Sequence, residues 1–150
     1  MTAQLHLAGP DDLDRLSTMS AAFHAEEGIA LNETHRRTAF EPLLKGAPQG
    51  AVYLIGPQRA PVGYLVLGFS WSIVQGGMTA WIDEIFLRPA VRGRGLGRDA
   101  ISAMARTLSQ ADVRSLYLDV RPGNTDAAKL YKKLGFQPRD TYVTLVKHLS

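Results

Sequence analysis

Helical and extended patterns of apolar residues divide the chain into a helical N-terminal part and an alternating remainder. Apolar side chains recur at helical spacing from Leu13 to about His24, directly after a proline and two aspartates at residues 10–12 that favour a helix start. Asn32 can cap a second helix, in which Pro42 should kink or shorten the backbone because it lacks an amide donor. We therefore expect two helices near the N-terminus, after a short edge strand.

Strand-like patterns take over in the middle of the chain. Three apolar runs, at residues 52–55, 62–71 and 79–87, are separated by short turn-rich segments, which predicts an antiparallel meander. An amphipathic helix follows from near Gly97, and a further apolar run covers residues 115–120. A strand, a crossover helix and another strand imply a parallel pair at this point in the sheet.

The C-terminal part begins with a helix that starts at Asn124 and stops at Gly135, which fits the position after a helix end. Residues 136–138 and 141–146 are predicted to supply the last extended pieces. No repeat, low-complexity segment or linker interrupts the 150 residues, so a single domain over residues 1–150 is expected. The expected fold class is α/β (α+β), with a mixed central sheet of six to seven strands and about four flanking helices.

Composition narrows the classes of function. The absence of cysteine excludes disulfides, thiolate metal sites and a cysteine nucleophile, and it is compatible with a reducing cytoplasm, where we expect the protein. The N-terminus lacks the pattern of a signal peptide, and no apolar stretch approaches the ~20 residues that span a membrane. The spacing of the four histidines offers no metal site. A net charge of +3 suits a polyanionic cofactor as well as it suits nucleic acid.

One stretch rich in glycine and arginine, residues 92–98, lies between the apolar run 81–87 and the helical run 97–108. Its three glycines let the backbone turn tightly and approach a ligand closely. The helix that follows directs N–H groups and the positive end of its dipole to the same place. The spacing matches neither the dinucleotide fingerprint nor the nucleotide-triphosphate loop. A diphosphate group is the ligand that this stretch favours.

The pattern Arg-x-x-Gly-x-Gly at Arg92, Gly95 and Gly97, preceded by residues 82–89, resembles the cofactor-binding motif of the GNAT N-acetyltransferase superfamily. Residues 124–136, with the pattern Asn…Ala…Leu-Tyr…Gly-Phe, resemble the second hallmark of that family. The resemblance covers nearly the whole chain. It implies the GNAT fold, in which the parallel pair of strands splays apart, and it implies acetyl-CoA (coenzyme A) as the cofactor. The residues that the resemblance places at the cofactor are Phe86, Leu87, Arg92, Gly93, Arg94, Gly95, Leu96, Gly97, Arg98 and Asn124.

The resemblance also implies catalytic residues. Tyr131 matches the tyrosine commonly assigned as general acid, since a phenol of pKa ~10 is protonated at neutral pH and can protonate a departing thiolate. The alternative for Tyr131 is a place in the buried face of its helix. Asp83 and Glu84 are candidates for the base; strand alternation predicts that they face opposite sides, and we favour Glu84. The residues expected at the wall of the acceptor site are His24, Glu26 and Glu27.

Three functions fit these patterns. The favoured one is an acetyl-CoA-dependent N-acetyltransferase that acetylates a primary amine of a small molecule or peptide by direct attack in a ternary complex. The alternatives are a GNAT-fold sensor or scaffold that binds acyl-CoA without turnover, and a nucleic-acid-binding module, which here lacks an interleaved aromatic platform. No nucleic acid, membrane or metal partner is expected. The run at residues 141–146 would lie towards a sheet edge, which favours a homodimer.

Overall fold

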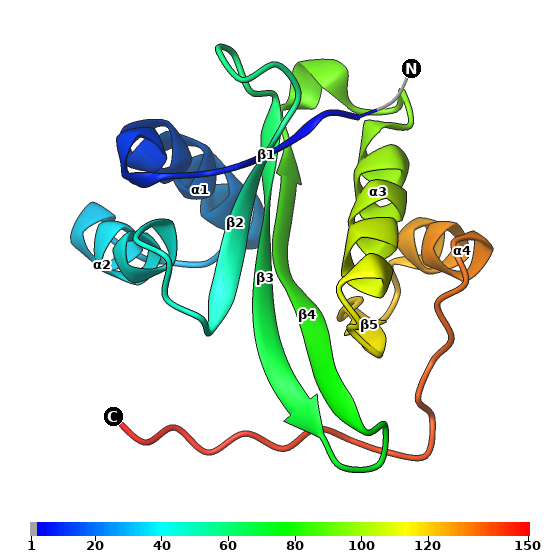
Figure 1. Cartoon of the computed structure of the whole chain (residues 1–150). Helices are drawn as coiled ribbons and strands as arrows, with labels where there is room; N and C mark the ends of the chain where they lie inside the picture. Colours follow the sequence, from blue (N-terminus) through cyan, green and yellow to red (C-terminus); the bar gives the residue numbers. More distant parts are fainter. Residues whose placement is uncertain (1–2) are drawn as a thin grey trace. The chain divides into compact units, whose positions relative to one another are not determined.

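The computed structural model describes residues 3–150, and the chain divides into two compact units, Met1–Asp119 and Val120–Ser150. Within the described residues, the first unit holds a mixed sheet with three α-helices, and the second unit holds one α-helix (Figure 1). The elements of the first unit are β1 (Leu5–Leu7), η1 (Pro10–Asp12), α1 (Leu13–Glu27), α2 (Glu33–Leu44), β2 (Gly50–Ile55), β3 (Gly63–Ser72), β4 (Gly77–Leu87), η2 (Pro89–Val91), α3 (Leu96–Gln110) and β5 (Ser115–Tyr117). The second unit contains α4 (Thr125–Lys133).

The strands of the sheet follow the order of the chain, β1-β2-β3-β4-β5. The pairs β1–β2, β2–β3 and β3–β4 are antiparallel, and the pair β4–β5 is parallel, with α3 as the crossover. This arrangement confirms the predicted meander followed by a parallel pair, and it confirms the α/β class. A parallel pair needs a long connection, and α3 supplies it.

The ladder between β3 and β4 contains a β-bulge that the sequence pattern did not reveal. Val66 lies opposite Glu84 and Leu67 lies opposite Ile82, so Asp83 is an extra residue on β4. An extra residue interrupts the strict alternation of side chains and redirects those beside it. The bulge therefore changes which way the two acidic residues of this strand point.

Helices cover the sheet of the first unit. In Figure 1, α1 and α2 lie on one side of the sheet and α3 lies on the other. The core beneath α1 and α2 buries large side chains from both layers, and full burial of each contributes about 1.5–3 kcal/mol to folding. Its largest members include Leu16, Met19, Phe40, Tyr64 and Phe86. This core fixes α1 against the strands that carry the acidic residues.

The two N-terminal helices end and begin where local chemistry predicts. The Asn32 side chain accepts a hydrogen bond of 2.7 Å from the backbone N–H of His35, which confirms it as the cap of α2. Pro42 lies in the last turn of α2, and the helix ends two residues later at Leu44. Because proline has no N–H, this turn of the helix is one hydrogen bond short, and the helix ends soon after it, as predicted.

The second unit consists of α4 and an extended tail. No described residue after Lys133 belongs to a strand, so the strands predicted at residues 136–138 and 141–146 are wrong, and the sheet has five strands rather than six to seven. The predicted strand at residues 115–120 is likewise shortened to Ser115–Tyr117. A strand exists only where a neighbour pairs with its backbone, and an alternating apolar pattern does not provide that neighbour. The apolar side chains of the tail are correspondingly exposed, from 71% for Tyr142 to 90% for Leu145.

Candidate active site

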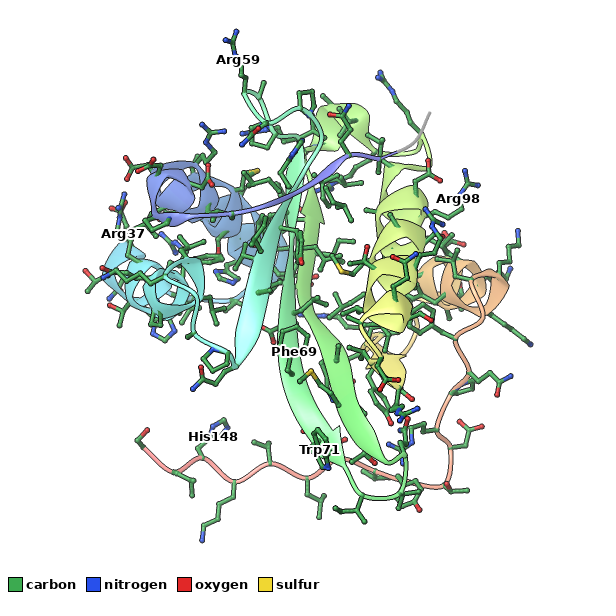
Figure 2. All side chains as sticks on the ribbon, viewed as in Figure 1. Arg37, Arg59, Phe69, Trp71, Arg98 and His148 are labelled. Atoms are coloured by element: carbon green, nitrogen blue, oxygen red, sulfur yellow. The ribbon has the colours of Figure 1, made fainter. Side chains whose placement is uncertain are left out.

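The glycine-rich stretch forms the turn between β4 and α3. Gly93 and Gly95 both have a φ of 79°, a left-handed conformation that favours glycine, and Gly95 is the N-cap residue of α3. The first N–H groups of a helix, here those of Leu96 and Gly97, have no intrahelical acceptor. Arg98 extends outward from the same turn (Figure 2). The tight turn and the helix start predicted from the sequence are therefore present, and anion binding there stays a prediction.

β4 runs past its parallel partner. The β4–β5 ladder ends where Trp81 lies opposite Tyr117, whereas β4 continues to Leu87. Residues 82–87 therefore have no ladder partner on the β5 side within the described sheet. Backbone N–H and C=O groups on such an edge need other hydrogen-bond partners. β4 is thus without a strand partner where the family resemblance implies that the pair splays apart. Phe86 and Leu87 lie on this stretch, and their predicted contact with the cofactor stays a prediction.

Arg92, in the glycine-rich turn, contacts the end of α1, a contact that was not predicted from the sequence. Its Nη2 donates to both carboxylate oxygens of Glu26, at 2.7 and 2.8 Å, and its Nε donates to the Leu87 carbonyl at 2.9 Å. The guanidinium also stands 5.6 Å from the centre of the Phe86 ring. Arg92 was predicted at the cofactor and Glu26 at the acceptor wall. In the structure they hold each other, and through them α1 is tied to the glycine-rich turn.

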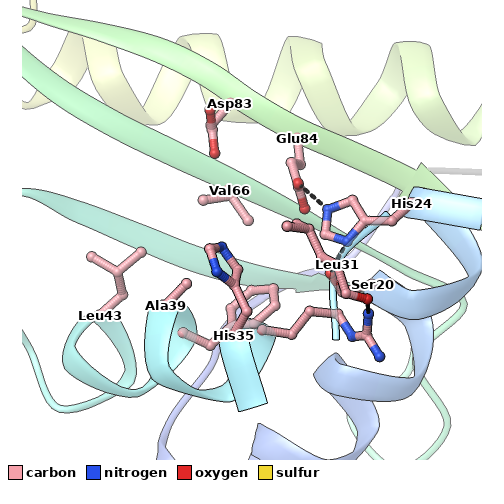
Figure 3. A pocket seen from close by; sticks show the side chains of 11 residues that line it. Ser20, His24, Leu31, His35, Ala39, Leu43, Val66, Asp83 and Glu84 are labelled. Atoms are coloured by element: carbon pink, nitrogen blue, oxygen red, sulfur yellow. Dashed lines mark hydrogen bonds and ion pairs between the residues drawn. The ribbon is translucent and has the colours of Figure 1, made fainter. Parts of the chain in front are cut away.

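A pocket of about 200 Å³ lies between α1, α2, β3 and β4, all within the first unit (Figure 3). Asp83 and Glu84 both line it, so the prediction that they face opposite sides of the sheet is wrong. The bulge at Asp83 explains the error, because alternation holds only for a regular strand. The rest of the lining is mixed: Leu31, Phe40 and Val66 are apolar, whereas His35 and Arg36 of α2 are polar.

Glu84 is held from two directions. His24 Nε2 lies 2.6 Å from Glu84 Oε2, and the Tyr64 hydroxyl donates to Glu84 Oε1 at 2.8 Å. An ionised carboxylate only accepts, so Nε2 of His24 carries a hydrogen. Ser20 Oγ stands 3.4 Å from Nδ1 of the same ring (Figure 3). Burial, then the charge of Glu84, raises the pKa of the fully buried Tyr64 well above 10, so this phenol stays a donor.

Asp83 has a different environment although it is the next residue. Its side chain is exposed, and it forms no hydrogen bond or ion pair with any residue of the described chain. Partial loss of hydration and then the charge of Glu84 raise the pKa of Asp83 above its ordinary value of 3.8, while His24 acts in the opposite direction. The pocket therefore contains one clamped carboxylate and one unclamped carboxylate.

The structure sorts the other predicted residues. Of the three residues expected at the acceptor wall, only His24 lines the pocket; Glu26 holds Arg92, and Glu27 is the last residue of α1. Tyr64 was missed by the sequence reasoning. In the sequence, Tyr64 shows only the alternation of an inward-facing strand residue. Its place next to the pocket follows from the strand register, which sets it opposite Phe86.

The remaining two predicted residues belong to the second unit. Asn124 caps α4, since its Oδ1 accepts from the backbone N–H of Ala127 at 3.2 Å. Tyr131 lies on α4 with its ring edge-on to Phe136, at 5.9 Å between centroids. Burial raises the pKa of the Tyr131 phenol above 10. Both predicted roles of Asn124 and Tyr131 at a cofactor stay predictions.

Among residues 3–150, no group of three or more histidine, aspartate or glutamate side chains could hold a metal ion. No described helix is long and apolar enough to cross a membrane.

Comparison with known proteins identifies the class. The sequence profile of the Acetyltransferase (GNAT) family matches residues 18–136, well over half of the chain, and the protein therefore belongs to this family. The family is one of acetyltransferases that use acetyl-CoA, so the resemblance read from the two motifs is confirmed, and the predicted enzyme class and cofactor agree with the family.

Individual relatives are distant. The chain is 33% identical to mycothiol acetyltransferase of Nocardia farcinica over 137 residues, which cover 87% of this chain and 44% of that protein. It is similar to an integron cassette protein from the mobile metagenome of Cole Harbour Salt Marsh, with a TM-score of 0.85 and 28% identity over 98% of this chain and 91% of that one. A crystal structure of a putative acetyltransferase from Arthrobacter sp. FB24 has a TM-score of 0.79 and 26% identity, over 98% and 95% of the two chains. The chain spans less than half the length of the curated relatives it matches first.

Proposed function

We propose that this protein is an acetyl-CoA-dependent N-acetyltransferase that acts on a primary amine of a small molecule or peptide, by direct attack in a ternary complex. One observation carries the proposal. The strand β4 has an unpaired edge that leads to the glycine-rich turn at the start of α3, and the same strand places two carboxylates in a pocket. A donor site and an acceptor site therefore share one strand.

The cofactor supplies an acetyl group activated as a thioester. Its diphosphate would be held by the turn from Arg92 to Arg98, where left-handed glycines and unbonded first-turn amides fit a doubly charged anion. The stretch of β4 that includes Phe86 and Leu87 has an edge without a strand partner and can offer backbone groups to a chain that contains amides, except for the Leu87 carbonyl, which accepts from Arg92. Asn124 of the second unit is included in this proposed set.

The acid pair performs the first step. A primary amine arrives as an ammonium ion, and Asp83 and Glu84 attract that charge into the pocket. One N–H bond of the ammonium breaks and an O–H bond forms on a carboxylate, which leaves a neutral amine with a free electron pair. That proton returns to solvent after the reaction.

Backbone and phenol perform the second step. Donors on the free edge of β4 polarise the carbonyl that the amine attacks, as an oxyanion hole does. The N–C bond forms and the C–S bond breaks, while Tyr131 gives its proton to the departing thiolate and regains one from the nitrogen. A phenol whose pKa lies above 10 is protonated at neutral pH and therefore has a proton to give to the thiolate.

The acceptor is a compact amine. A pocket of about 200 Å³, lined by apolar side chains together with His35 and Arg36, accommodates a small amine or the first residue of a peptide. The names of related proteins include acetyltransferases of thialysine, of spermine and spermidine, and of a ribosomal-protein alanine, all of which are amines. A cytoplasmic location and a single functional domain stay part of this proposal.

A homodimer also belongs to this proposal. The tail after α4 exposes Tyr142, Val143, Leu145 and Val146, and apolar side chains in an extended segment favour pairing with another strand. Light scattering at increasing concentration should show a mass of two chains, and a monomer at every concentration would remove this element.

The enzymatic proposal is tested by mixing the protein with acetyl-CoA and a panel of alkylamines, polyamines and peptides with free α-amines. Release of the CoA thiol, together with an N-acetylated product in mass spectrometry, is expected for at least one class. The double variant Asp83→Asn, Glu84→Gln should still bind CoA but lose transfer. Tight binding of CoA with no product from any amine would support the sensor alternative instead.

A further inference from the structure

The two adjacent carboxylates in the pocket, Asp83 and Glu84, differ in their hydrogen bonds. Both oxygens of Glu84 accept short hydrogen bonds, from His24 at 2.6 Å and from Tyr64 at 2.8 Å. Asp83 accepts none from the described chain. Charge-assisted bonds of this length fix a carboxylate in one orientation. The pocket wall therefore holds a rigid charge next to a carboxylate that can rotate.

The bulge in β4 is what brings the pair to one side. Without it, residues 83 and 84 would point to opposite faces of the sheet. The register change between Val66 and Leu67 sets Glu84 opposite Val66 and leaves Asp83 without an opposing residue. An unpaired position on a strand can direct its side chain independently of the ladder. The backbone thus separates the two acids into a paired and an unpaired position.

The two donors to Glu84 are themselves immobile. The Tyr64 ring is fully buried, 6.0 Å from the Phe40 ring and 5.9 Å from the Phe86 ring. The His24 side chain is 7% exposed and is anchored on α1, next to Phe23. One donor comes from the sheet and the other from the helix layer above it. Glu84 is consequently clamped between the two layers of the core.

Building on the proposed function, we propose that His24 and Tyr64 are positioning residues that clamp Glu84 as the fixed anion for the acceptor ammonium, and that Asp83 is the carboxylate that takes the proton. The step balances: one ammonium N–H bond breaks, one O–H bond forms on Asp83, and the amine keeps the electron pair. Asp83 is exposed, so it can release the proton to solvent after each turnover. Glu84 keeps its charge and its bonds throughout.

The surroundings of Asp83 are consistent with this division. The groups that face the pocket are Glu84 on β4, His24 on α1, and His35 and Arg36 on α2. Dehydration and the Glu84 charge raise the pKa of Asp83, which makes it a stronger base than a free aspartate. The Glu84 charge raises the pKa of Asp83 only while Glu84 stays close to it, and the hydrogen bonds from His24 and Tyr64 hold Glu84 there.

Kinetics of four variants test the assignment. Asp83→Asn should lower kcat by ~10²–10⁴-fold with a strongly basic amine, as expected for a lost base. The same variant should regain most of its rate with a weakly basic amine that is already neutral at the assay pH. Tyr64→Phe and His24→Leu should raise KM for the amine by about tenfold, from one lost bond to a charged group, without changing KM for acetyl-CoA. His24→Gln, which keeps an N–H donor, should stay near the wild-type value.

Several outcomes would overturn the inference. One is a wild-type pH–rate profile in Asp83→Asn. Another is a fall in kcat of that variant that is equal for basic and weakly basic amines. A third is an equal rise in KM for the amine in His24→Leu and His24→Gln. Thermal unfolding of each variant separates a lost fold from a lost role.

A titration without turnover separates this inference from the proposed function. Carboxyl carbon NMR of the free protein should give a midpoint for Asp83 above 3.8, and Glu84→Gln should lower it. An Asp83 midpoint at or below 3.8 that Glu84→Gln does not move contradicts the division of roles even if the enzyme is active. A shifted midpoint in a protein that acetylates no amine leaves the clamp standing and removes the function.

Discussion

The two regions along β4 that we propose to be functional have opposite chemistry. At its C-terminal end, the glycine-rich turn presents backbone N–H groups and the positive end of α3, and its side chains are largely exposed. In its middle, the bulge presents two carboxylates, one of which is clamped by side chains from α1 and β3. The first region depends on the absence of side chains, and the second depends on their placement. Substitutions in the two regions should therefore fail in different ways.

The largest effect is expected at the turn. Gly97→Val should abolish CoA binding, because the new side chain occupies the place where first-turn amides would approach a diphosphate. The fold should survive, since a Cβ at Gly97 would meet only the Leu87 side chain, at 3.5 Å. Calorimetric titration with CoA measures the loss.

Gly68→Val is a matched control for this variant. It lies in β3, and a Cβ there would meet nothing within 4 Å, so CoA affinity should be unchanged. Equal CoA affinity in Gly97→Val and wild type would show that the turn is not the cofactor site.

Tyr131→Phe should have the next largest effect. The substitution keeps the ring and its edge-on contact with Phe136 and removes only the hydroxyl. We expect kcat to fall by ~10²–10⁴-fold, with little change in stability, in CoA affinity or in KM for acetyl-CoA. Steady-state kinetics with an accepted amine give the answer. A wild-type rate, with chemistry shown to be rate-limiting, would mean that another acid or a water protonates the thiolate.

The arginine that ties the glycine-rich turn to α1 should give a smaller effect. Arg92→Ala removes a charge next to the turn and should weaken CoA binding by about tenfold. Its exposed ion pair with Glu26 should contribute less than about 1 kcal/mol to stability. Arg37→Ala, which breaks exposed ion pairs with Asp14 and Glu33, is the control and should leave CoA affinity unchanged.

Glu26→Gln tests this link between the turn and α1 from the other side. The carboxylate competes with phosphate for the Arg92 guanidinium, so its neutralisation should leave CoA affinity equal to wild type or raise it by up to about threefold. A decrease of tenfold would show that Glu26 orders the turn instead of competing for its arginine.

The smallest effect concerns stability and pH. Because the pKa of Asp83 is raised in the folded state, the folded protein binds this proton more strongly than the unfolded chain does. Its contribution to stability is therefore lost as pH rises through the window above 3.8. Asp83→Asn should raise Tm at pH 7. The corresponding gain in the free energy of unfolding should be less than about 1 kcal/mol, because an exposed charge is screened. The gain should vanish at pH 3, and a gain that persists there would point to packing rather than charge.

The predictability of the two regions differs for a physical reason. The turn is one continuous stretch whose shape depends on its backbone, so Gly95, Gly97 and their flanking strand and helix were sufficient to predict where it lies, while its cofactor role stays a prediction. The pocket is assembled from residues as far apart as His24 and Glu84, and their contact depends on strand register and helix docking. The bulge at Asp83 is also invisible to a rule of strict alternation.

The tail shows a second limit. Its apolar alternation predicted a strand at residues 141–146, but a strand also needs a partner, and none of the described chain pairs with it. By contrast, the caps at Asn32 and Asn124 were predicted correctly, because a cap depends only on residues within one turn.

A crystal structure with CoA bound tests the central claim most directly, because that claim is that β4 connects a cofactor site with an acceptor pocket. The diphosphate should lie against the N–H groups of Leu96 and Gly97, and the pantetheine arm should follow the edge of β4 between Ile82 and Leu87. The thiol should then end beside the pocket that contains Asp83 and Glu84. A diphosphate held elsewhere, or an arm that leaves this edge unpaired, would contradict the account.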